Sequence, residues 1–230
     1  MRVATVTTPL AFEGVRLGGQ ATELLDLAVP EHHTVAVLGD DDSGVGALGG
    51  YALGLERPLA GRATVFGVLI ADLAELERLA FRRRVGYLPA GEGLLQNLSL
   101  RDNVALPLRF GSDAAPHEID GRVSVMLTAV RVAAAAQRRP AQANEEERRR
   151  AAIARATAFD PPLVIMEQPF DGLTARAAAE LLEFVRGGET AAGARRTILI
   201  TGQELPAVIH RRIERTYRLT RAGALELEPA

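Results

Sequence analysis

The 230-residue sequence contains no cysteine and no lysine, so all 27 of its basic residues are arginine. Without cysteine, disulfide bonds, thiolate metal sites and cysteine nucleophiles are excluded. Without lysine, the chain cannot supply the lysine that a P-loop places on the β- and γ-phosphates of a nucleotide. The four histidines, His32, His33, His117 and His210, are not spaced as a ligand set, so we expect no metal site.

A strong charge of one sign and a long apolar run are also lacking. The formal net charge is -2 and the pI is about 6.1, which gives no basic field for nucleic acid. No apolar run approaches the ~20 residues of a membrane-spanning helix. The first residues, MRVATVTTPLAFEG, lack the apolar segment of a signal peptide. We therefore expect a cytoplasmic protein that binds no nucleic acid and does not itself span the membrane.

What is present is a globular composition, with 47% hydrophobic and 24% charged residues. Apolar runs predict strands at residues 10–17, 34–38, 63–70, 84–88, 163–166 and 197–201. Helical periodicity predicts helices at residues 72–80, 116–132, 144–158 and 175–186, with another opening at residues 47–48. A hairpin is expected around residues 221–223. Strands that alternate with helices indicate a mainly parallel sheet with helices on its faces.

Two helix starts carry capping signals. Ser99 and Asp102 have capping-box form before an apolar-periodic run. Asn144 can cap the helix that follows it, and Glu145, Glu146 and Glu147 suit the positive end of its dipole. We expect these glutamates to pair with residues 148–150, all arginine, at i,i+3 spacing.

Three longer segments occur in a specific order: RRRVGYLPAGEGLLQNLSLRDNVALPL, RRRAAIARATAFDPPLVIMEQPFDGL and RTILITGQEL. They resemble the Q-loop region, the signature helix with the Walker B strand and D-loop, and the switch strand of ABC transporter ATPases. The resemblance implies an α/β, P-loop NTPase-like fold with an antiparallel portion near the N-terminus and a helical insert. It also implies one domain over residues 1–230, with a RecA-like core at about 1–90 and 151–230 and a helical subdomain at about 91–150.

The family's P-loop, G-x-x-x-x-G-K-[ST], is matched with departures. Its positions are held by Gly39, Asp40, Asp41, Asp42, Ser43, Gly44, Val45 and Gly46. Val45 replaces the phosphate-binding lysine, and Gly46 replaces the hydroxyl that holds Mg²⁺. The three aspartates would repel phosphate or fill the loop's own anion nest; alternatively, the loop is only a permissive solvated turn.

The resemblance places further replacements at the other nucleotide-handling positions. No adenine-stacking aromatic is found near Gly18 and Gly19. The matched positions are Ala90 for the Q-loop glutamine, Asn144, Glu145, Glu146 and Glu147 for the signature, Glu167 for Walker B, Gln168 for the catalytic glutamate, Thr174 for the D-loop and Gly202 for the switch histidine. An amide such as Gln168 has no basic form and cannot serve as a general base. No catalytic residue is therefore expected intact, and binding of the family ligand Mg-ATP is not expected, so no cofactor is predicted.

Three hypotheses follow from this pattern. The first is a pseudo-ATPase subunit that binds a membrane permease, on the cytoplasmic face, and dimerises with itself or with an active ATPase subunit. The second is a working ATPase in which residues 82–84, three arginines, replace the lysine. The third is a soluble regulatory or scaffold module without a permease. The segment LLQNLSLRDNVALPL is most similar to subunits that serve lipid or lipoprotein traffic.

Overall fold

The structure is a computed structural model that describes residues 8–18, 21–187 and 195–228. Its described strands form a three-stranded sheet in the order β2-β1-β4 and a six-stranded sheet in the order β5-β6-β7-β3-β8-β9. The strands are β1 (Leu10–Arg16), β2 (Leu25–Val29), β3 (Thr34–Leu38), β4 (Ala60–Val65), β5 (Val85–Leu88), β6 (Leu163–Glu167), β7 (Thr197–Gly202), β8 (Arg215–Leu219) and β9 (Leu225–Leu227). The helices are α1 (Ala47–Ala52), α2 (Glu75–Arg82), α3 (Leu100–Gly111), α4 (Pro116–Ala129), α5 (Glu145–Ala156), α6 (Ala175–Arg186) and α7 (Ala207–His210).

The large sheet is parallel from β5 to β8, and only β9 runs antiparallel, on the edge. Every residue of β3, β6 and β7 is buried, as expected for central strands covered on both faces. Neighbours along β3 face two different cores: Val35 and Val37 belong to one apolar cluster, and Ala36 and Leu38 belong to the other. The expected α/β class with a mainly parallel sheet is confirmed.

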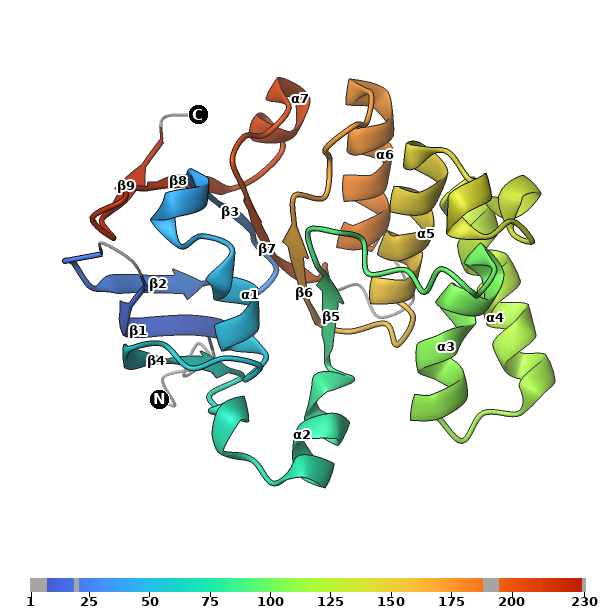
Figure 1. The fold of residues 1–230 in the computed structure, drawn as a ribbon, viewed down its shortest axis with the longest axis horizontal. Coiled ribbons are helices and arrows are strands. Elements are labelled where there is room, and N and C mark those ends of the chain that lie inside the picture. The colour runs from blue at the N-terminus through green and yellow to red at the C-terminus, as the bar shows by residue number, and fades with distance from the viewer. Residues whose placement is uncertain (1–7, 19–20, 188–194, 229–230) are drawn as a thin grey trace, which may run out of the picture.

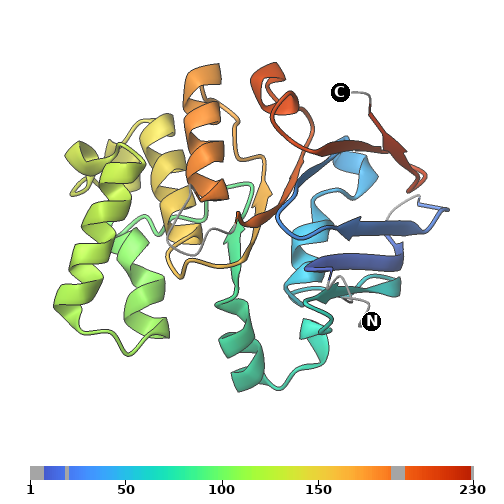
Figure 2. The same ribbon diagram turned by 180° about the vertical axis from the view of Figure 1, so that it is seen from behind.

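The elements are arranged in layers (Figures 1 and 2). The three-stranded antiparallel sheet lies at one end of the molecule and α3 and α4 lie at the other, with α5 and α6 beside the parallel strands between them. The arrows of β5 and β6 point to the upper edge in Figure 1. Ligands of open parallel sheets bind at the carboxyl ends of the strands, so this edge is where a site is expected.

A buried amide in α3 fixes the conformation of the segment that leads into this helix. Asn103 in α3 is fully buried. Its Oδ1 accepts the Leu95 N–H at 2.7 Å, and its Nδ2 donates to the carbonyls of Leu95 and Ser99 at 3.1 and 2.9 Å. These bonds fix the segment between β5 and α3. Ser99 caps α3, but Asp102 accepts from the Ser99 hydroxyl at 2.5 Å instead of from the backbone N–H that a capping box predicts.

Two predicted elements have different bounds. The strand expected at residues 63–70 is β4 (Ala60–Val65), and it stops because Phe66 and Gly67 turn the chain with φ of 49° and 75°. The helix expected at residues 72–80 is α2 (Glu75–Arg82), since residues 70–72 form a 3-10 turn first. The expected hairpin is present, with Leu219 opposite Leu225 and Gly223 at φ 96°.

The division into a core and a helical subdomain stays a prediction. Helix α5 runs without a break through residue 150, where the expected boundary lies. Within the described residues, no helix is both long and apolar enough to cross a membrane.

Candidate functional site

In the loop after β3, several backbone N–H and carbonyl groups form hydrogen bonds with other groups of the chain. The Gly39 N–H donates to the Gly202 carbonyl at 2.9 Å, which joins the loop to the end of β7. The Ser43 hydroxyl donates to the Asp40 carbonyl at 2.6 Å and accepts the Val45 N–H at 3.3 Å, and the Ser43 N–H also donates to Asp40. Two N–H groups of this predicted anion nest are therefore already bonded within the loop.

Val45, at the predicted lysine position, lies in an apolar environment. Its exposed fraction is 6%, and it belongs to the same cluster as Leu17, Leu48 and Tyr51. A valine in this setting contributes to the core and offers no donor to a phosphate. Position 45 is therefore part of the packing between the loop and α1.

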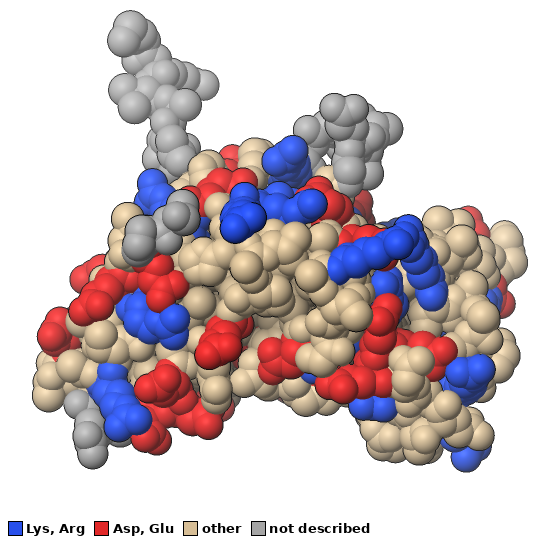
Figure 3. Space-filling model, turned by 90° about the horizontal axis from the view of Figure 1, so that it is seen from above, with Lys and Arg blue, Asp and Glu red and all other residues tan. Residues whose placement is uncertain are grey.

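The outer face of the loop is acidic. Asp40, Asp41 and Asp42 are all exposed. The Gln203 amide donates to Asp41 Oδ1 at 2.7 Å, and Arg221 of the β8–β9 hairpin lies 3.8 Å from a carboxylate oxygen of Asp40 and of Asp42. Figure 3 views the molecule from above and shows red acidic side chains gathered along one side of this face, with arginines between them.

Glu167, at the Walker B position, has both carboxylate oxygens engaged within the chain. The Tyr87 hydroxyl donates to its Oε1 at 2.6 Å, and the Ala90 N–H donates to its Oε2 at 3.2 Å. Burial, followed by the bond to Glu167, raises the pKa of Tyr87 well above its ordinary value. Gly49 of α1 lies so close that a Cβ there would come within 2.9 Å of the Tyr87 ring. The carboxylate therefore ties β6 to the segment after β5.

Several predicted positions surround one small hollow of about 100 Å³. It is lined by Asp41, Val45, Gly46, Ala90, Glu167, Gln168, Thr201, Gly202 and Gln203. Sites for drug-sized ligands have volumes of about 300–1,000 Å³. Of the two carboxylates that line the hollow, Glu167 has both oxygens engaged and Asp41 has one oxygen held by Gln203. Magnesium is usually held by one or two carboxylates, so an ion in this hollow would compete with the hydrogen bonds that these oxygens already accept.

Gln168, at the catalytic-glutamate position, is held by its backbone. Its N–H donates to the Thr201 carbonyl at 2.7 Å, and its φ is 47°, a left-handed conformation that is uncommon outside glycine. A Cβ added to Gly202, the switch position, would lie 3.7 Å from Gln168. The two positions thus face each other, as an amide beside a glycine.

The signature and D-loop positions lie outside the hollow. Asn144 caps α5 through its Oδ1, which accepts the Glu147 N–H at 2.8 Å, while Glu147 accepts the Asn144 N–H at 3.0 Å. The capping box is therefore complete. Thr174 caps α6, its hydroxyl accepting the Ala177 N–H at 3.2 Å.

The expected i,i+3 pairs of α5 are wrong. Arg148 instead bonds Glu92 at 3.2 Å, and Arg150 pairs with Glu146 at 2.7 Å with i,i+4 spacing. Glu147 pairs with Arg138 at 3.1 Å. The side chains of α5 point to different neighbours because the helix packs against other elements along its length.

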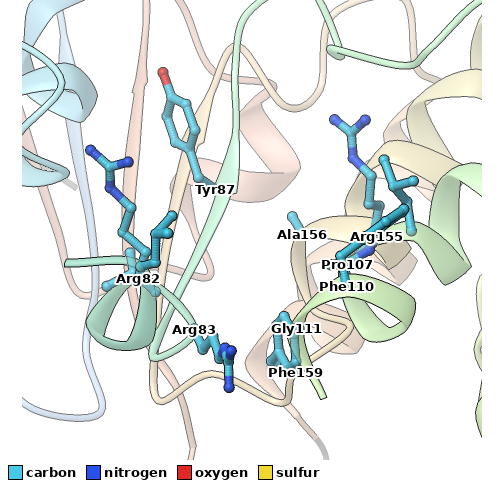
Figure 4. A pocket seen from close by; sticks show the side chains of 12 residues that line it. Arg82, Arg83, Tyr87, Pro107, Phe110, Gly111, Arg155, Ala156 and Phe159 are labelled. Atoms are coloured by element: carbon cyan, nitrogen blue, oxygen red, sulfur yellow. The ribbon is translucent and has the colours of Figure 1, made fainter. Parts of the chain in front are cut away.

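A much larger groove, which Tyr87 helps to line, lies between α2 and α3 (Figure 4). Its volume is about 650 Å³. It is lined by Leu79, Arg82, Arg83, Val85, Tyr87, Leu106, Pro107, Phe110, Gly111, Arg155, Ala156 and Phe159. Figure 4 shows Arg82 and Arg83 on one side and Pro107 and Phe110 on the other, with Phe159 beside Gly111.

The arginines at residues 82–84, proposed as substitutes for a P-loop lysine, make other contacts. Arg82 donates to the Leu53 carbonyl at 3.1 and 2.9 Å. The Arg84 guanidinium lies 4.3 Å from the centre of the Phe66 ring, a cation–π contact. Neither side chain lines the hollow of about 100 Å³. Of the predicted adenine-stacking positions, Gly19 lies outside the described residues.

Three residues of the site were missed by sequence reasoning. Tyr87 was assigned only to a strand, although a tyrosine beside a buried carboxylate needs a hydrogen-bond partner. Gly49 carries no signal in the sequence, because the need for a bare Cα depends on the packing of α1 against β6. Arg221 was assigned to a turn, and its nearness to the acidic loop depends on the hairpin's position beside β3.

The comparisons with known proteins agree on one family. The model of the ABC transporter family matches residues 23–171. The chain is 33% identical over 166 residues to the lipoprotein-releasing system ATP-binding protein LolD of Chromohalobacter salexigens, covering 72% of this chain and 70% of that relative. It is 30% identical over 165 residues to the sulfate/thiosulfate import ATP-binding protein CysA of Mesorhizobium japonicum, covering 70% of this chain but 46% of the relative.

A solved structure is similar over nearly its full length. It is the dimeric, post-hydrolysis ATP-binding cassette MJ0796 bound to ADP and Pi, which matches with a TM-score of 0.81 and 23% identity over 96% of this chain and 97% of that one. At that identity the likeness concerns the fold alone. From the family model, the curated relatives and the architecture together, the chain belongs to the ABC transporter family.

Proposed function

We propose that this chain is a non-hydrolysing homologue of an ABC transporter ATP-binding subunit, which serves a membrane permease as a docked partner. The proposal rests on the loop after β3, whose polar groups form hydrogen bonds with one another. Val45 is buried in the core where the family has a lysine, and the Ser43 hydroxyl accepts the Val45 N–H, which would otherwise be free to bind phosphate. Three exposed aspartates on the same loop oppose a triphosphate.

The residues that would carry out hydrolysis support the same reading. Gln168 has no basic form that could activate water, and Gly202 offers no side chain beside it. Glu167 is bonded to Tyr87 and Ala90, so it would have to break contacts within the chain to bind a metal. Each replacement alone could be compensated, but together they leave no base, no metal ligand and no phosphate clamp.

The groove between α2 and α3 supports the proposal that the chain binds a permease. In the family this neighbourhood receives a helix of the membrane subunit, and here it is open, with a volume of about 650 Å³. Phe110 and Leu79 on its rim are 84% and 51% exposed. Exposed apolar side chains beside a concave surface are typical of an interaction site. We propose a peripheral position on the cytoplasmic face of the membrane, with a homodimer or a heterodimer with an active ATPase subunit.

A working ATPase is the second candidate, because the curated relatives are named as ATP-binding proteins. It requires the loop to rearrange so that Ser43 releases the Val45 N–H. A module without a permease is the third candidate, and the open groove argues against it.

Isothermal calorimetry with Mg-ATP and Mg-ADP tests the loss of nucleotide binding. We expect no heat up to millimolar nucleotide at low or moderate salt, which corresponds to binding weaker than about -4 kcal/mol. The lipoprotein-releasing relative, titrated in the same buffer, is the positive control. Micromolar binding with steady phosphate release would overturn the proposal and establish the ATPase instead.

A further inference from the structure

A third concave region lies at the amino ends of the parallel strands, at the opposite edge of the sheet from the P-loop. Thr197 begins β7, Pro162 precedes β6 and His32 precedes β3, and all three line a cavity of about 290 Å³ that we call the amino-end cavity. None of the described residues that line it is a position matched to nucleotide handling. Its volume is near the lower limit of small-molecule sites, which is about 300 Å³, so it fits a small ligand.

One wall of the amino-end cavity is apolar and rigid. It is formed by Pro9, Pro161, Pro162 and the ring of Phe66. Proline has a fixed φ and no backbone N–H, so this wall is preformed and offers no donor of its own. A preformed apolar wall accepts an apolar group without the entropic cost of ordering flexible side chains.

Three residues that line the cavity have a left-handed backbone. The φ angles of His32, Phe66 and Asp160 are 62°, 49° and 55°. Histidine and aspartate adopt this conformation more often than most residues, but for a bulky phenylalanine it is an outlier. The His32 N–H donates to the Thr197 hydroxyl and the Phe66 N–H donates to the Pro9 carbonyl, both at 2.9 Å. Strain that the surrounding contacts enforce in this way is concentrated at ligand sites.

The positive charge of the cavity is buried, whereas its negative charge is exposed. The Arg196 side chain is 14% exposed, but that of Asp160, which accepts a hydrogen bond from it, is 67% exposed. Glu31, the other carboxylate of the lining, is also exposed. Water and salt screen the exposed carboxylates more than the buried guanidinium, so the interior of the cavity favours an anion.

The two arginines of the cavity have N–H groups that the described residues do not use. Arg196 Nη1 donates to the Val185 carbonyl at 2.7 Å and Nη2 donates to Asp160, but its buried Nε has no acceptor. Arg195 is exposed, and among the described residues no carboxylate oxygen lies within 4.0 Å of it. Arg195 is therefore the accessible anchor for an anion, and the buried charge of Arg196 lies behind it.

We propose that the amino-end cavity binds a small carboxylate with an apolar body. The body packs against the prolines and the Phe66 ring, and the carboxylate faces Arg195, since guanidinium and carboxylate groups pair bidentately. A phosphate would bring a second negative charge close to Glu31 and Asp160, so a single charge fits the cavity better. The inference does not depend on the proposed function, because the cavity shares no lining residue with the P-loop hollow or with the groove between α2 and α3.

Saturation-transfer difference NMR on the full chain tests this site. The probes are isovalerate and its neutral amide, isovaleramide, which have nearly the same shape, and inorganic phosphate is added as a competitor. The proteins are the wild type, Arg195→Gln, Phe66→Asn and the matched control Arg83→Gln. Arg83 is an exposed arginine that lines the groove between α2 and α3, so the control detects carboxylate binding at that groove.

We expect isovalerate to bind about tenfold more tightly than isovaleramide, which is the effect of one hydrogen bond to a charged group. The preference should be lost in Arg195→Gln and persist in Arg83→Gln. Phe66→Asn should weaken both probes alike, because asparagine adopts a left-handed backbone readily and keeps the turn. Phosphate at the same concentration should not displace isovalerate.

The other outcomes overturn the assignment. Equal affinity of the two probes, displacement by phosphate, or loss of the preference in Arg83→Gln would show that the cavity does not select a carboxylate. Unchanged binding in Phe66→Asn, or no binding of either probe at millimolar concentration, would show that the cavity is not a ligand site. Neither result bears on nucleotide binding, which calorimetry decides separately.

Discussion

Two concave regions of this molecule share one tyrosine but differ in every other respect. The hollow at the P-loop has a volume of about 100 Å³, and both carboxylates that line it, Glu167 and Asp41, accept hydrogen bonds from within the chain. The groove between α2 and α3 has a volume of about 650 Å³, and its arginines have no carboxylate partner among the described residues. Tyr87 lines the groove, and its hydroxyl bonds Glu167 of the hollow.

The difference separates groups used for folding from groups available for binding. A polar group that binds a ligand must be left partly unsatisfied in the free protein, which lowers stability. A polar group satisfied within the chain contributes to stability, and its removal leaves a buried partner unpaired. Substitutions in the hollow should therefore cost stability, whereas substitution of an exposed groove side chain such as Phe110 should cost binding alone.

The largest expected effect follows from Glu167→Ala. It leaves the Tyr87 hydroxyl and the Ala90 N–H without their acceptor, and an unsatisfied buried donor costs about 1–3 kcal/mol. We expect the free energy of unfolding in urea to fall by roughly 2–3 kcal/mol. Glu167→Gln keeps one acceptor oxygen and should lose less.

Glu204→Ala is the matched control, because Glu204 is an exposed carboxylate that follows β7 at the same edge of the sheet. It should change stability by no more than about 0.5 kcal/mol. If Glu167→Ala were neutral or stabilising and Mg²⁺ stabilised the wild type, Glu167 would be a metal ligand kept free for that purpose. The comparison between hollow and groove would then fail.

A smaller effect is expected for Tyr87→Phe, and it depends on pH. At neutral pH the loss of one hydrogen bond should cost about 1 kcal/mol. The folded-state pKa of Tyr87 is raised, so its neutral phenol stabilises the fold below the unfolded pKa of about 10. That contribution is lost as pH rises above about 10, because the unfolded chain then releases the proton first.

The direction of this pH dependence is checked by measuring the urea midpoints of wild type and Tyr87→Phe from pH 8 to 11. The wild type should lose stability more steeply above pH 10 than Tyr87→Phe, so the two curves should converge. Tyr51, whose pKa burial also raises, is present in both proteins and cancels in the difference. Parallel curves over the whole range would mean that Tyr87 ionises as it does in water.

Much of the fold could be predicted from the sequence, because the buried strands are continuous apolar runs. The apolar runs at residues 34–38 and 197–201 predict strands, and both strands lie in the centre of the sheet. The end of β4 could not be placed, because Phe66 adopts a positive φ that no local signal requires. Strand β2, with alternating exposed residues, was not predicted.

The positions of the candidate site were predicted by resemblance, but their contacts were not. The family pattern assigned Glu167 and Ala90 separately, and the bond between them depends on how the segment after β5 folds back over β6. The i,i+3 pairs of α5 failed for a related reason. Local spacing ignores carboxylates such as Glu92, which is distant in sequence and lies beside Arg148 in the fold.

The smallest effect on stability is expected in the groove, where Phe110→Ser should separate binding from folding. Phe110 is 84% exposed, so its loss removes little buried area and should change the free energy of unfolding by less than about 0.5 kcal/mol. Its control is Val125→Ser, a 70% exposed apolar residue on α4, outside the residues that line the groove. Both variants should unfold like wild type in urea, yet only Phe110→Ser should lose affinity for an amphipathic helical peptide that carries leucine and phenylalanine on one face. A loss of more than about 1 kcal/mol in Phe110→Ser alone would mean that the ring is part of the core. The side chains of the groove would then stabilise the fold, as those of the hollow do, and would not be free for binding.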